Sequence, residues 1–282
     1  MRSDRLRLAA LTLMGLLCLV VGAEKPAPEP VEKTKVSARL GDLHADVAVL
    51  QALNALQPTA AQTKALIEVA AKTMQKAPPR RKVEVSEDYL KALTAVRAAL
   101  ISGDEEKIES TQAAFDKLAE KEDPEPDEVE ITDEARRVAP RLLKRFSARQ
   151  IAFYVGGLRD FPDPAEDTIR AMDESRTIDK KDWPALRDDV AFQVGWLVAS
   201  LDADAEEKIR DKVVALLDRA ARLDKAAFEK QRPALEKEAR ALAGDLGPTD
   251  VLRHFMERVI AETVSNHRFE AAVKMREAES TD

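Results

Sequence analysis

Three histidines carry the side chains best suited to metal binding or proton transfer in this chain of 282 residues, namely His44, His254 and His267. His254 and Glu257 have the i, i+3 spacing that occurs in helical metal sites. His267 lies 13 positions after His254, which on one straight helix leaves the two side chains about 220° apart and excludes a shared site. His254 also falls on the polar side of the neighbouring apolar stripe. We therefore predict a solvated His254 and no metal site.

The other catalytic residue types also lack a productive arrangement. Asp188 and Asp189 are adjacent on an expected helix and point about 100° apart, so they do not form a paired-carboxylate site. No serine lies in a glycine-flanked nucleophile elbow. Gly156-Gly157, inside a helical pattern, is typical of a bend or a close helix approach rather than of a phosphate loop. We predict no catalytic residue, no cofactor and no enzymatic activity.

A run of basic residues stands out against the acidic composition. Six positive charges follow one another with no acidic residue between them: Arg136, Arg137, Arg141, Lys144, Arg145 and Arg149. Directly upstream lie seven acidic residues: Glu120, Glu122, Asp123, Glu125, Asp127, Glu128 and Glu130. Two interpretations stay open. The two blocks screen each other locally, or the basic residues form a patch for an anionic partner such as a lipid headgroup, a cell-wall polymer or an acidic client protein.

Two expected helix starts share one pattern, a hydroxyl residue followed three positions later by glutamine and then by an apolar, helix-forming run. The pairs are Thr59 with Gln62 and Ser147 with Gln150. In such a capping box the hydroxyl accepts a hydrogen bond from the third backbone amide of the helix, and the side chain at that position accepts one from the capping residue's amide. Each pair therefore predicts the first turn of a helix.

Thr59-Ala60-Ala61-Gln62 and Ser147-Ala148-Arg149-Gln150 resemble degenerate copies of the L-T-x-x-Q motif of small helical periplasmic proteins of the Spy and CpxP type. That family carries the motif twice, at helix starts, in exported, cysteine-poor, all-helical chains that act as stress-linked, energy-independent chaperones. The present chain has Pro58 and Phe146 in place of the motif's leucine, has Ser147 in place of its threonine, and is larger than the family's usual size. The resemblance implies an all-helical fold and a chaperone-like activity.

Residues 1–23 have the pattern of a signal peptide. Three arginines precede an uncharged apolar run from Leu8 to Ala23, and small or modest residues stand where a signal peptidase would cut. The run is shorter than the roughly 20 apolar residues of a membrane span, although retention as an anchor is the alternative. Residues 24–35, with three prolines, predict an extended tether. We expect an exported protein, periplasmic or extracellular, that has no transmembrane span and no cysteine once the signal segment is removed.

The overall composition favours helix. Apolar residues make up 45% of the chain and charged residues 34%, whereas aromatic residues make up 4% and glycines number only 9. Ala, Leu, Glu, Lys and Arg lose little conformational freedom in a helix, and Gly is the costly residue. We predict an all-α protein of about ten helices without a sheet. The net charge of −7 argues against nucleic-acid binding, which usually requires a basic surplus.

The helices are expected to form two related bundles. The predicted units are residues 36–119 and 132–282, joined by an acidic linker at 120–131. Besides the capping boxes, Glu105-Glu106-Lys107-Ile108 recurs letter for letter as Glu206-Glu207-Lys208-Ile209. Matches of four residues arise readily by chance in a chain rich in Lys and Glu, so coincidence and internal duplication both stay open. If the duplication is real, helical units of one plan would stack by covering each other's apolar faces.

The most regular apolar stripe predicts helix-on-helix packing. Its members step by four and three residues: Ile209, Val213, Leu216, Ala220, Leu223 and Ala227. Such a stripe either binds other proteins or is buried inside its own helical bundle. The first function that we expect is an envelope protein-interaction or chaperone-like role, with other envelope proteins or unfolded clients as partners. The alternatives are electrostatic attachment to an anionic envelope surface through the basic patch, and a structural scaffold.

Overall fold

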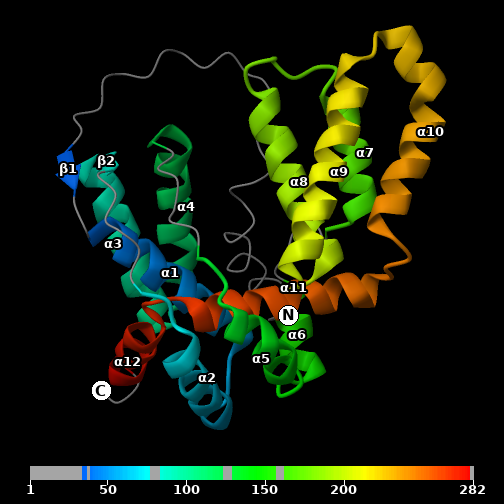
Figure 1. The fold of residues 1–282 in the computed structure, drawn as a ribbon. Coiled ribbons are helices and arrows are strands. Elements are labelled where there is room, and N and C mark those ends of the chain that lie inside the picture. Colours follow the sequence, from blue (N-terminus) through cyan, green and yellow to red (C-terminus); the bar gives the residue numbers. More distant parts are fainter. Residues whose placement is uncertain (1–33, 37–38, 77–82, 123–128, 157–161, 280–282) are drawn as a thin grey trace, which may run out of the picture. The chain divides into compact units, whose positions relative to one another are not determined.

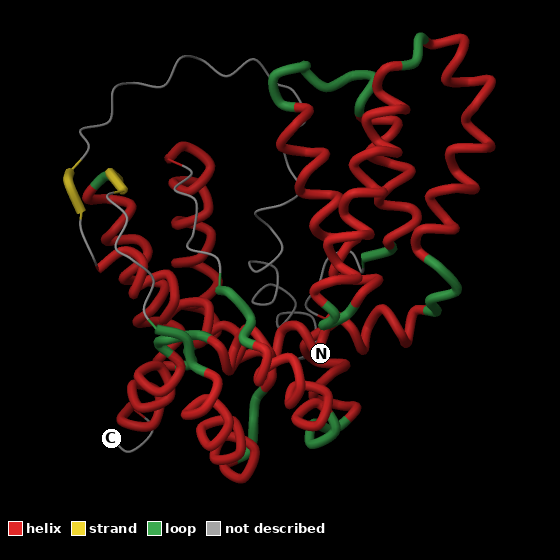
Figure 2. The backbone as a smooth tube through the Cα atoms, in the orientation of Figure 1, coloured by secondary structure: helices red, strands yellow, loops and turns green. Residues whose placement is uncertain are grey.

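The computed structural model describes residues 34–36, 39–76, 83–122, 129–156 and 162–279. These residues form twelve α-helices and one pair of short strands (Figures 1 and 2). The all-α prediction is confirmed, with two helices more than the ten expected. The predicted signal peptide, the tether up to residue 33 and residues 123–128 of the predicted linker lie outside these ranges. None of the twelve helices combines the length and the apolar character that a membrane crossing requires.

The elements follow one another in chain order. They are β1 (Thr34–Val36), α1 (Arg39–Leu56), α2 (Ala60–Thr73), β2 (Val83–Val85), α3 (Glu87–Ser102), α4 (Glu105–Glu122), α5 (Asp133–Leu143), α6 (Ala148–Gly156), α7 (Pro164–Glu174), α8 (Trp183–Ala199), α9 (Ala203–Arg222), α10 (Lys225–Ala243), α11 (Pro248–Ser265) and α12 (Phe269–Glu279).

The chain divides into two compact units. Unit 1 comprises the described residues of Glu24–Arg159 and Val259–Asp282, and unit 2 comprises those of Asp160–Arg258. These units differ from the predicted pair, because the division does not fall at the acidic linker. Helices α5 and α6 pack on α2 and α1 and so belong to unit 1. The residues after 258 also return to unit 1, which makes this unit discontinuous in sequence.

Side-chain caps determine where several helices begin. Ser86 and Thr132 each accept a hydrogen bond from the backbone amide three residues later, at 3.0 and 3.2 Å. Asp163 caps α7, and Pro164 occupies the first helical position. A capping oxygen satisfies amide donors that have no partner inside the helix, and proline loses nothing at a position whose amide would be unpaired. Each of these starts depends on residues within one turn and is therefore a local feature of the sequence.

The last helical segment differs from its prediction. The apolar pattern after Thr249 predicts one helix of about 28 residues, whereas the chain forms α11 and α12 with a break after Ser265. The Asn266 side-chain oxygen accepts a hydrogen bond from the Arg268 amide at 2.9 Å. A short polar side chain that bonds its own nearby backbone competes with the helix and interrupts it.

A short pair of strands was also not expected from the sequence. β1 and β2 pair in antiparallel fashion, with Lys35 opposite Glu84. Each strand has three residues, which is too short for an alternating apolar pattern to show in the sequence. The two strands join the segment before α1 to the segment before α3.

Unit 1 is organised around α1, which contacts α3, α6 and α12. Helices α3 and α4 form a second contact pair, and α2 and α5 form a third. The inward face of α1 is fully apolar over its second half, where Leu50, Leu53 and Leu56 are at most 1% exposed. From α3, Tyr89 packs edge-on against Phe115 of α4, with 5.0 Å between the ring centroids. The unit thus has its own core.

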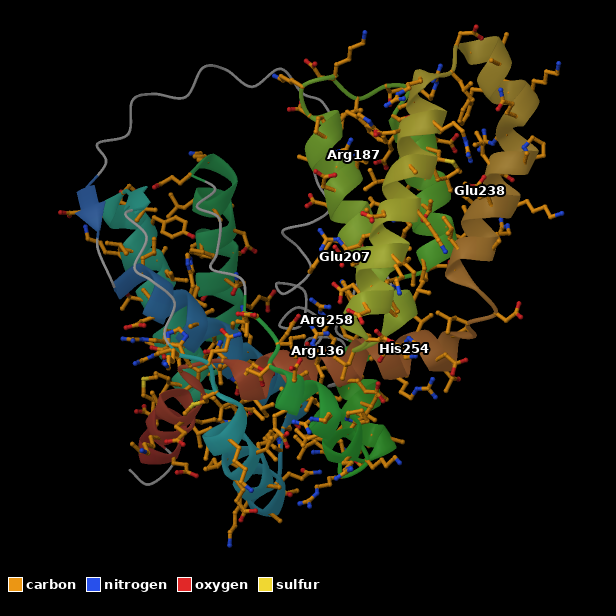
Figure 3. The ribbon with its side chains drawn as sticks, viewed as in Figure 1. Arg136, Arg187, Glu207, Glu238, His254 and Arg258 are labelled. Atoms are coloured by element: carbon orange, nitrogen blue, oxygen red, sulfur yellow. The ribbon has the colours of Figure 1, made fainter. Side chains whose placement is uncertain are left out.

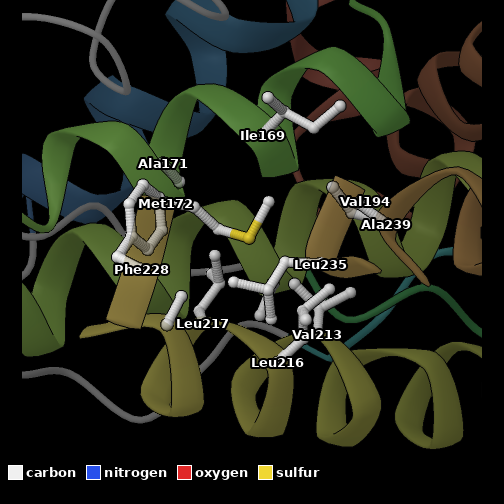
Figure 4. Close-up of a cluster of buried hydrophobic side chains, with 12 residues drawn as sticks. Ile169, Ala171, Met172, Val194, Val213, Leu216, Leu217, Phe228, Leu235 and Ala239 are labelled. Carbon is white, nitrogen blue, oxygen red and sulfur yellow. The ribbon is translucent and has the colours of Figure 1, made fainter. Parts of the chain in front are cut away.

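In unit 2 the helices α7 to α10 pack around one apolar core, to which all four contribute (Figure 4). The regular stripe lies inside this core, since Val213, Leu216 and Ala220 of α9 are at most 1% exposed. The predicted seam does not run on as one helix, because α9 ends at Arg222 and its last member, Ala227, belongs to α10. The stripe is therefore used within the unit.

Helices α8 and α9 approach each other closely at Gly195. A Cβ atom at this position would lie 3.2 Å from the Glu206 carbonyl oxygen and 2.5 Å from Cγ of Arg210. Glycine costs helix stability in the middle of a helix, so its presence here needs a local reason. The missing side chain lets the two backbones meet.

Candidate functional site

Both predicted capping boxes form. In the first, the Thr59 hydroxyl accepts a hydrogen bond from the Gln62 amide at 3.3 Å, and the Gln62 side-chain oxygen accepts one from the Thr59 amide at 2.8 Å. In the second, the Ser147 hydroxyl accepts from the Gln150 amide at 3.3 Å, and the Gln150 side-chain oxygen accepts from the Ser147 amide at 3.0 Å. Helices α2 and α6 begin directly after these capping residues.

The two glutamines also contact each other, which the sequence does not predict. Gln150 donates to the side-chain oxygen of Gln62 at 3.0 Å, and Gln62 donates to that of Gln150 at 3.2 Å. Each amide group in addition reaches the backbone in front of the other box. Gln62 donates to the Arg145 carbonyl at 2.6 Å, and Gln150 donates to the Gln57 carbonyl at 3.0 Å. One pair of side chains therefore joins the α1–α2 turn to the α5–α6 turn.

This paired-glutamine contact has an approximate two-fold character. Arg145 follows Gln57 in the chain by the same 88 positions that separate Gln150 from Gln62. The helices pack in the same reciprocal way: the first helix of each pair contacts the second helix of the other, or the reverse, since α1 packs on α6 and α2 packs on α5. The pairs α1–α2 and α5–α6 thus contact each other in a reciprocal way, and internal duplication of the chain stays a prediction.

The repeated Glu-Glu-Lys-Ile segments do not occupy equivalent positions. Glu105 is the first residue of α4, whereas its counterpart Glu206 is the fourth residue of α9. Glu105 is exposed, and Glu206 is buried in an ion pair with Arg258. The two segments therefore lie at different positions in their helices.

The six predicted basic residues lie on α5, on the turn that follows it and on the first turn of α6. Arg136 is half-buried and has a partner within the protein (Figure 3). Arg137 pairs with Glu134 at 2.5 Å. The remaining four side chains are exposed and form no ion pair with any residue that the structure describes: Arg141, Lys144, Arg145 and Arg149. We call these four residues the basic corner.

A tight turn fixes the backbone of the basic corner. The amides of Arg145 and Phe146 donate to the carbonyls of Leu142 and Leu143 at 2.9 and 3.0 Å, which closes the last turn of α5. Phe146 is buried and anchors the turn in the unit. Gln62 also donates a hydrogen bond to the Arg145 carbonyl of this turn. The paired-glutamine contact and the basic corner thus belong to one structural element, and an ordered backbone carries the four cations.

The surroundings of the basic corner contain no carboxylate in the sequence. No acidic residue occurs from 135 to 159, although the chain has 52 of them. On α6 the exposed positions are small or cationic, namely Ala148, Arg149, Ala152 and Gly156, and Phe153 beside them is half-buried. Among the described residues of this sequence range, the exposed positions are therefore cationic, small or, at Ser147, polar, and none is acidic.

The histidines act as hydrogen-bonding partners. The prediction of a solvated His254 is wrong, because its ring is buried and Nδ1 donates to the Leu197 carbonyl at 2.7 Å (Figure 3). The prediction assumed that one side of this helix meets water, whereas α11 is buried there as well. His44 contacts the Tyr89 hydroxyl at 2.9 Å. In the described ranges, no three metal-binding side chains come together.

Asp188 and Asp189 have different surroundings. Asp188 binds Arg187 at 2.8 Å, and burial, with a smaller effect of the Asp188 charge, raises the pKa of Asp189. A cavity of about 220 Å³ lies near Asp188, between α8 and α9. It is lined by Asp188, Ala191, Glu207, Arg210, Asp211 and Val214. This lining holds exposed acids and one arginine, with neither a nucleophile nor a buried polar group facing the space.

Gly156 does not support a close helix approach. It is exposed at the end of α6, and open space stands where its side chain would lie. Gly157 lies outside the described residues. The close approach that the sequence suggests for this pair occurs instead at Gly195 of unit 2.

Sequence reasoning missed a buried carboxylate in unit 1. The Asp46 side chain is only 1% exposed and binds Arg268 at 2.8 Å and Arg97 at 3.1 Å. The Asp46 hydrogen bond raises the pKa of the Arg268 guanidinium, because it favours the charged form. A signal was present in the sequence, since Asp46 lies three residues after Leu43 and four before Leu50 and so interrupts the buried face of α1.

A second buried ion pair stabilises unit 2. Arg258 binds Glu206 at 3.1 Å, and both side chains are 10% exposed. The Arg258 guanidinium also lies 5.1 Å from the ring centre of Phe192 and 5.3 Å from that of Trp196. Aromatic faces attract a cation and reduce the cost of removing it from water. These contacts explain a buried charge pair in structural terms.

Comparisons of the chain with protein-family models, with curated proteins and with solved structures found no match. Function must therefore be argued from the geometry and charge of the residues themselves. Of the features above, the basic corner is the one that gathers four exposed cations with no carboxylate between them in the sequence.

Proposed function

We propose that this chain is an exported, non-catalytic binding protein that attaches to an anionic component of the cell envelope through the basic corner. The supporting observation is the exposure of four cations at one turn, none of them paired with a residue in the described ranges. Paired charges cancel much of each other's field, whereas unpaired cations attract an anionic partner and orient it.

The residue types in the corner suit oxyanions. Three of its four members are arginines. The planar guanidinium group binds a phosphate or carboxylate through two parallel hydrogen bonds, which a lysine cannot do. The cations are exposed, so their attraction at distances beyond about 10 Å is screened in 0.1 M salt. Attachment through the corner is therefore expected to be sensitive to salt.

A cation-exchange resin tests the proposal directly. The chain from Glu24 onward contains every described element. At neutral pH and low salt it should be retained despite its negative net charge, and added salt should release it. A variant in which the whole corner becomes glutamine should pass through: Arg141→Gln, Lys144→Gln, Arg145→Gln and Arg149→Gln.

A matched control removes the same charge elsewhere. Four exposed lysines of α9 and α10 serve this purpose, replaced as Lys208→Gln, Lys212→Gln, Lys230→Gln and Lys237→Gln. This control should be retained like the unchanged chain. Equal loss of retention in both variants would mean that net charge, and not the corner, decides the interaction.

A chaperone-like role is the second candidate. It is supported by the paired-glutamine contact, which joins the two segments that resemble the L-T-x-x-Q motif. A holdase needs exposed apolar surface for its clients, whereas the regular stripe of α9 is used inside unit 2. The test is aggregation of an unfolded client protein with and without this chain. Suppression that persists at raised salt supports the role, because apolar contact is not screened, and unchanged aggregation contradicts it.

A further inference from the structure

We infer that the anionic component is the surface of a lipid bilayer, on which the basic corner and the exposed side of α6 dock together. This inference rests on the proposed function and names its partner. It starts from the side of α6 that follows the corner in the chain, where the character of the surface changes from cationic to apolar.

The exposed face of α6 begins at Arg149, which is also a member of the basic corner. Arg149, Ala152, Phe153 and Gly156 have the i, i+3, i+4, i+7 spacing that places side chains on one face of a helix. Three of these residues are exposed and Phe153 is half-buried. Arg149 belongs both to this face and to the corner. The combined surface thus has cations at one end and an apolar strip at the other.

This combination favours a bilayer over an acidic protein. Cations alone recognise an acidic segment, which does not require an apolar strip beside them. At a bilayer surface the phosphates lie above the start of the acyl chains. A helix that presents arginine or lysine next to phenylalanine can therefore bind the phosphates with its cations and contact the acyl chains with its aromatic ring. A carboxylate on the docking side would be repelled by anionic lipid. None occurs in the sequence from 135 to 159.

The structure also indicates the mode of attachment. α6 has nine residues, and only part of one side is exposed. Docking is therefore peripheral and reversible. Each lysine or arginine near an anionic bilayer contributes roughly fivefold in affinity, so the four cations of the corner provide most of the binding, and the apolar strip adds depth and orientation.

Vesicle co-sedimentation tests the inference with the chain from Glu24 onward. It should bind vesicles that contain phosphatidylglycerol and should not bind vesicles of phosphatidylcholine alone. The corner variant should raise the lipid concentration at half-binding by at least about tenfold. The lysine control on α9 and α10 should change it by less than about threefold, because those cations lie outside the docking surface. Circular dichroism of each variant confirms that the helices are retained.

Two substitutions at the exposed Ala152 probe the apolar strip separately. Ala152→Leu should strengthen vesicle binding several-fold without altering retention on the cation-exchange resin, because it adds apolar area and no charge. Ala152→Glu should weaken vesicle binding more than Ala152→Gln does, because the carboxylate is repelled by anionic lipid. If neither leucine nor glutamate changes vesicle binding, the α6 face is not in contact with lipid and the inference is wrong.

The outcomes separate the inference from the proposed function. Retention on the resin without vesicle binding would overturn the bilayer as partner and leave attachment through the corner intact. Binding of polyglutamate in that case would identify an acidic protein segment instead. Loss of both resin retention and vesicle binding would overturn both proposals. Equal binding to neutral and anionic vesicles would overturn the inference, because the cations would then contribute nothing to lipid binding, and the resin would still decide the proposed function.

Discussion

At the scale of single residues, Asp46 shows what a carboxylate on an apolar helix face requires. Its side chain is 1% exposed and is held by Arg268 and Arg97, whose side chains are 30% and 33% exposed. Asp46→Asn removes the charge and leaves two arginines without their counter-ion. We expect a loss of about 2–3 kcal/mol in the free energy of unfolding, less than for a fully buried pair because the arginines reach water.

Denaturant unfolding measures this effect, and Asp42→Asn is the matched control. Asp42 lies one turn earlier on α1, is 46% exposed and pairs with His267 at 3.1 Å. Its replacement should cost less than about 1 kcal/mol, as for other exposed pairs. Similar losses for the two variants would show that the burial of Asp46 does not matter.

Burial dominates the electrostatics of Asp167 on α7. Burial raises its pKa above the ordinary value of 3.8, although the nearby Arg170 charge acts in the other direction. A raised pKa means that the folded chain holds the proton more tightly than the unfolded chain. The contribution of Asp167 to stability therefore falls as the pH rises from 3.8 through the raised pKa.

We expect Asp167→Asn to remove this dependence, because asparagine does not ionise. The amide oxygen can still accept the hydrogen bond that Asp167 receives from the Asp163 amide. The measurement is the free energy of unfolding of both chains at several pH values between 4 and neutrality. The variant should gain stability relative to the unchanged chain as the pH rises. A constant difference between them would refute the expected effect of burial.

At the scale of elements, the close contact of α8 and α9 makes a clear prediction for Gly195. Gly195→Ala places a methyl group 3.2 Å from a backbone oxygen of α9, and only the Arg210 side chain can move aside. Overpacking of this kind costs about 1–3 kcal/mol. Thermal unfolding measures the loss. Gly156→Ala is the control, because open space surrounds that position, and it should leave the melting temperature equal or higher.

The paired-glutamine contact predicts coupling between residues 88 positions apart. Gln62→Ala and Gln150→Ala each remove hydrogen bonds to the other box. The double variant should therefore lose less stability than the two single losses added together, by about 0.5–1.5 kcal/mol. A double-mutant cycle from denaturant unfolding provides this number. Strict additivity would mean that the two side chains do not stabilise each other.

These elements also show what could be read from the sequence. The helix starts at Ser86, Thr132 and Asp163 were predictable, because a cap depends on residues within one turn. The contact between Gln62 and Gln150 was not, because it depends on how two distant turns pack. The basic block was visible in the sequence, but the cations that remain unpaired depend on local geometry, such as the Arg137 pairing with Glu134.

At the scale of the whole molecule, unit 1 depends on residues from two distant parts of the chain. The Asn266 side chain donates to the Ala45 carbonyl at 3.3 Å, and Thr73 donates to the Val264 carbonyl at 2.8 Å. Arg268 completes the Asp46 site. We expect a chain that stops at Arg258 to lose hydrogen-exchange protection in α1 and α3 while α7 to α10 keep theirs, because those four helices share their own core. Equal protection of α1 in the shortened and full chains would contradict this.

The return of residues after 258 to unit 1 sets an order of events during synthesis. A polypeptide emerges amino end first, from the ribosome and from an export channel alike, and its segments become available one after another. All residues of α7 to α10 have then been synthesised, whereas Arg268 has not. Asp46 of α1 therefore still lacks this ion-pair partner. The Thr73–Val264 and Asp46–Arg268 contacts span 191 and 222 positions, and contacts of such sequence separation form slowly. Among the described helices, α1 is thus synthesised first and acquires its last contacts at the end.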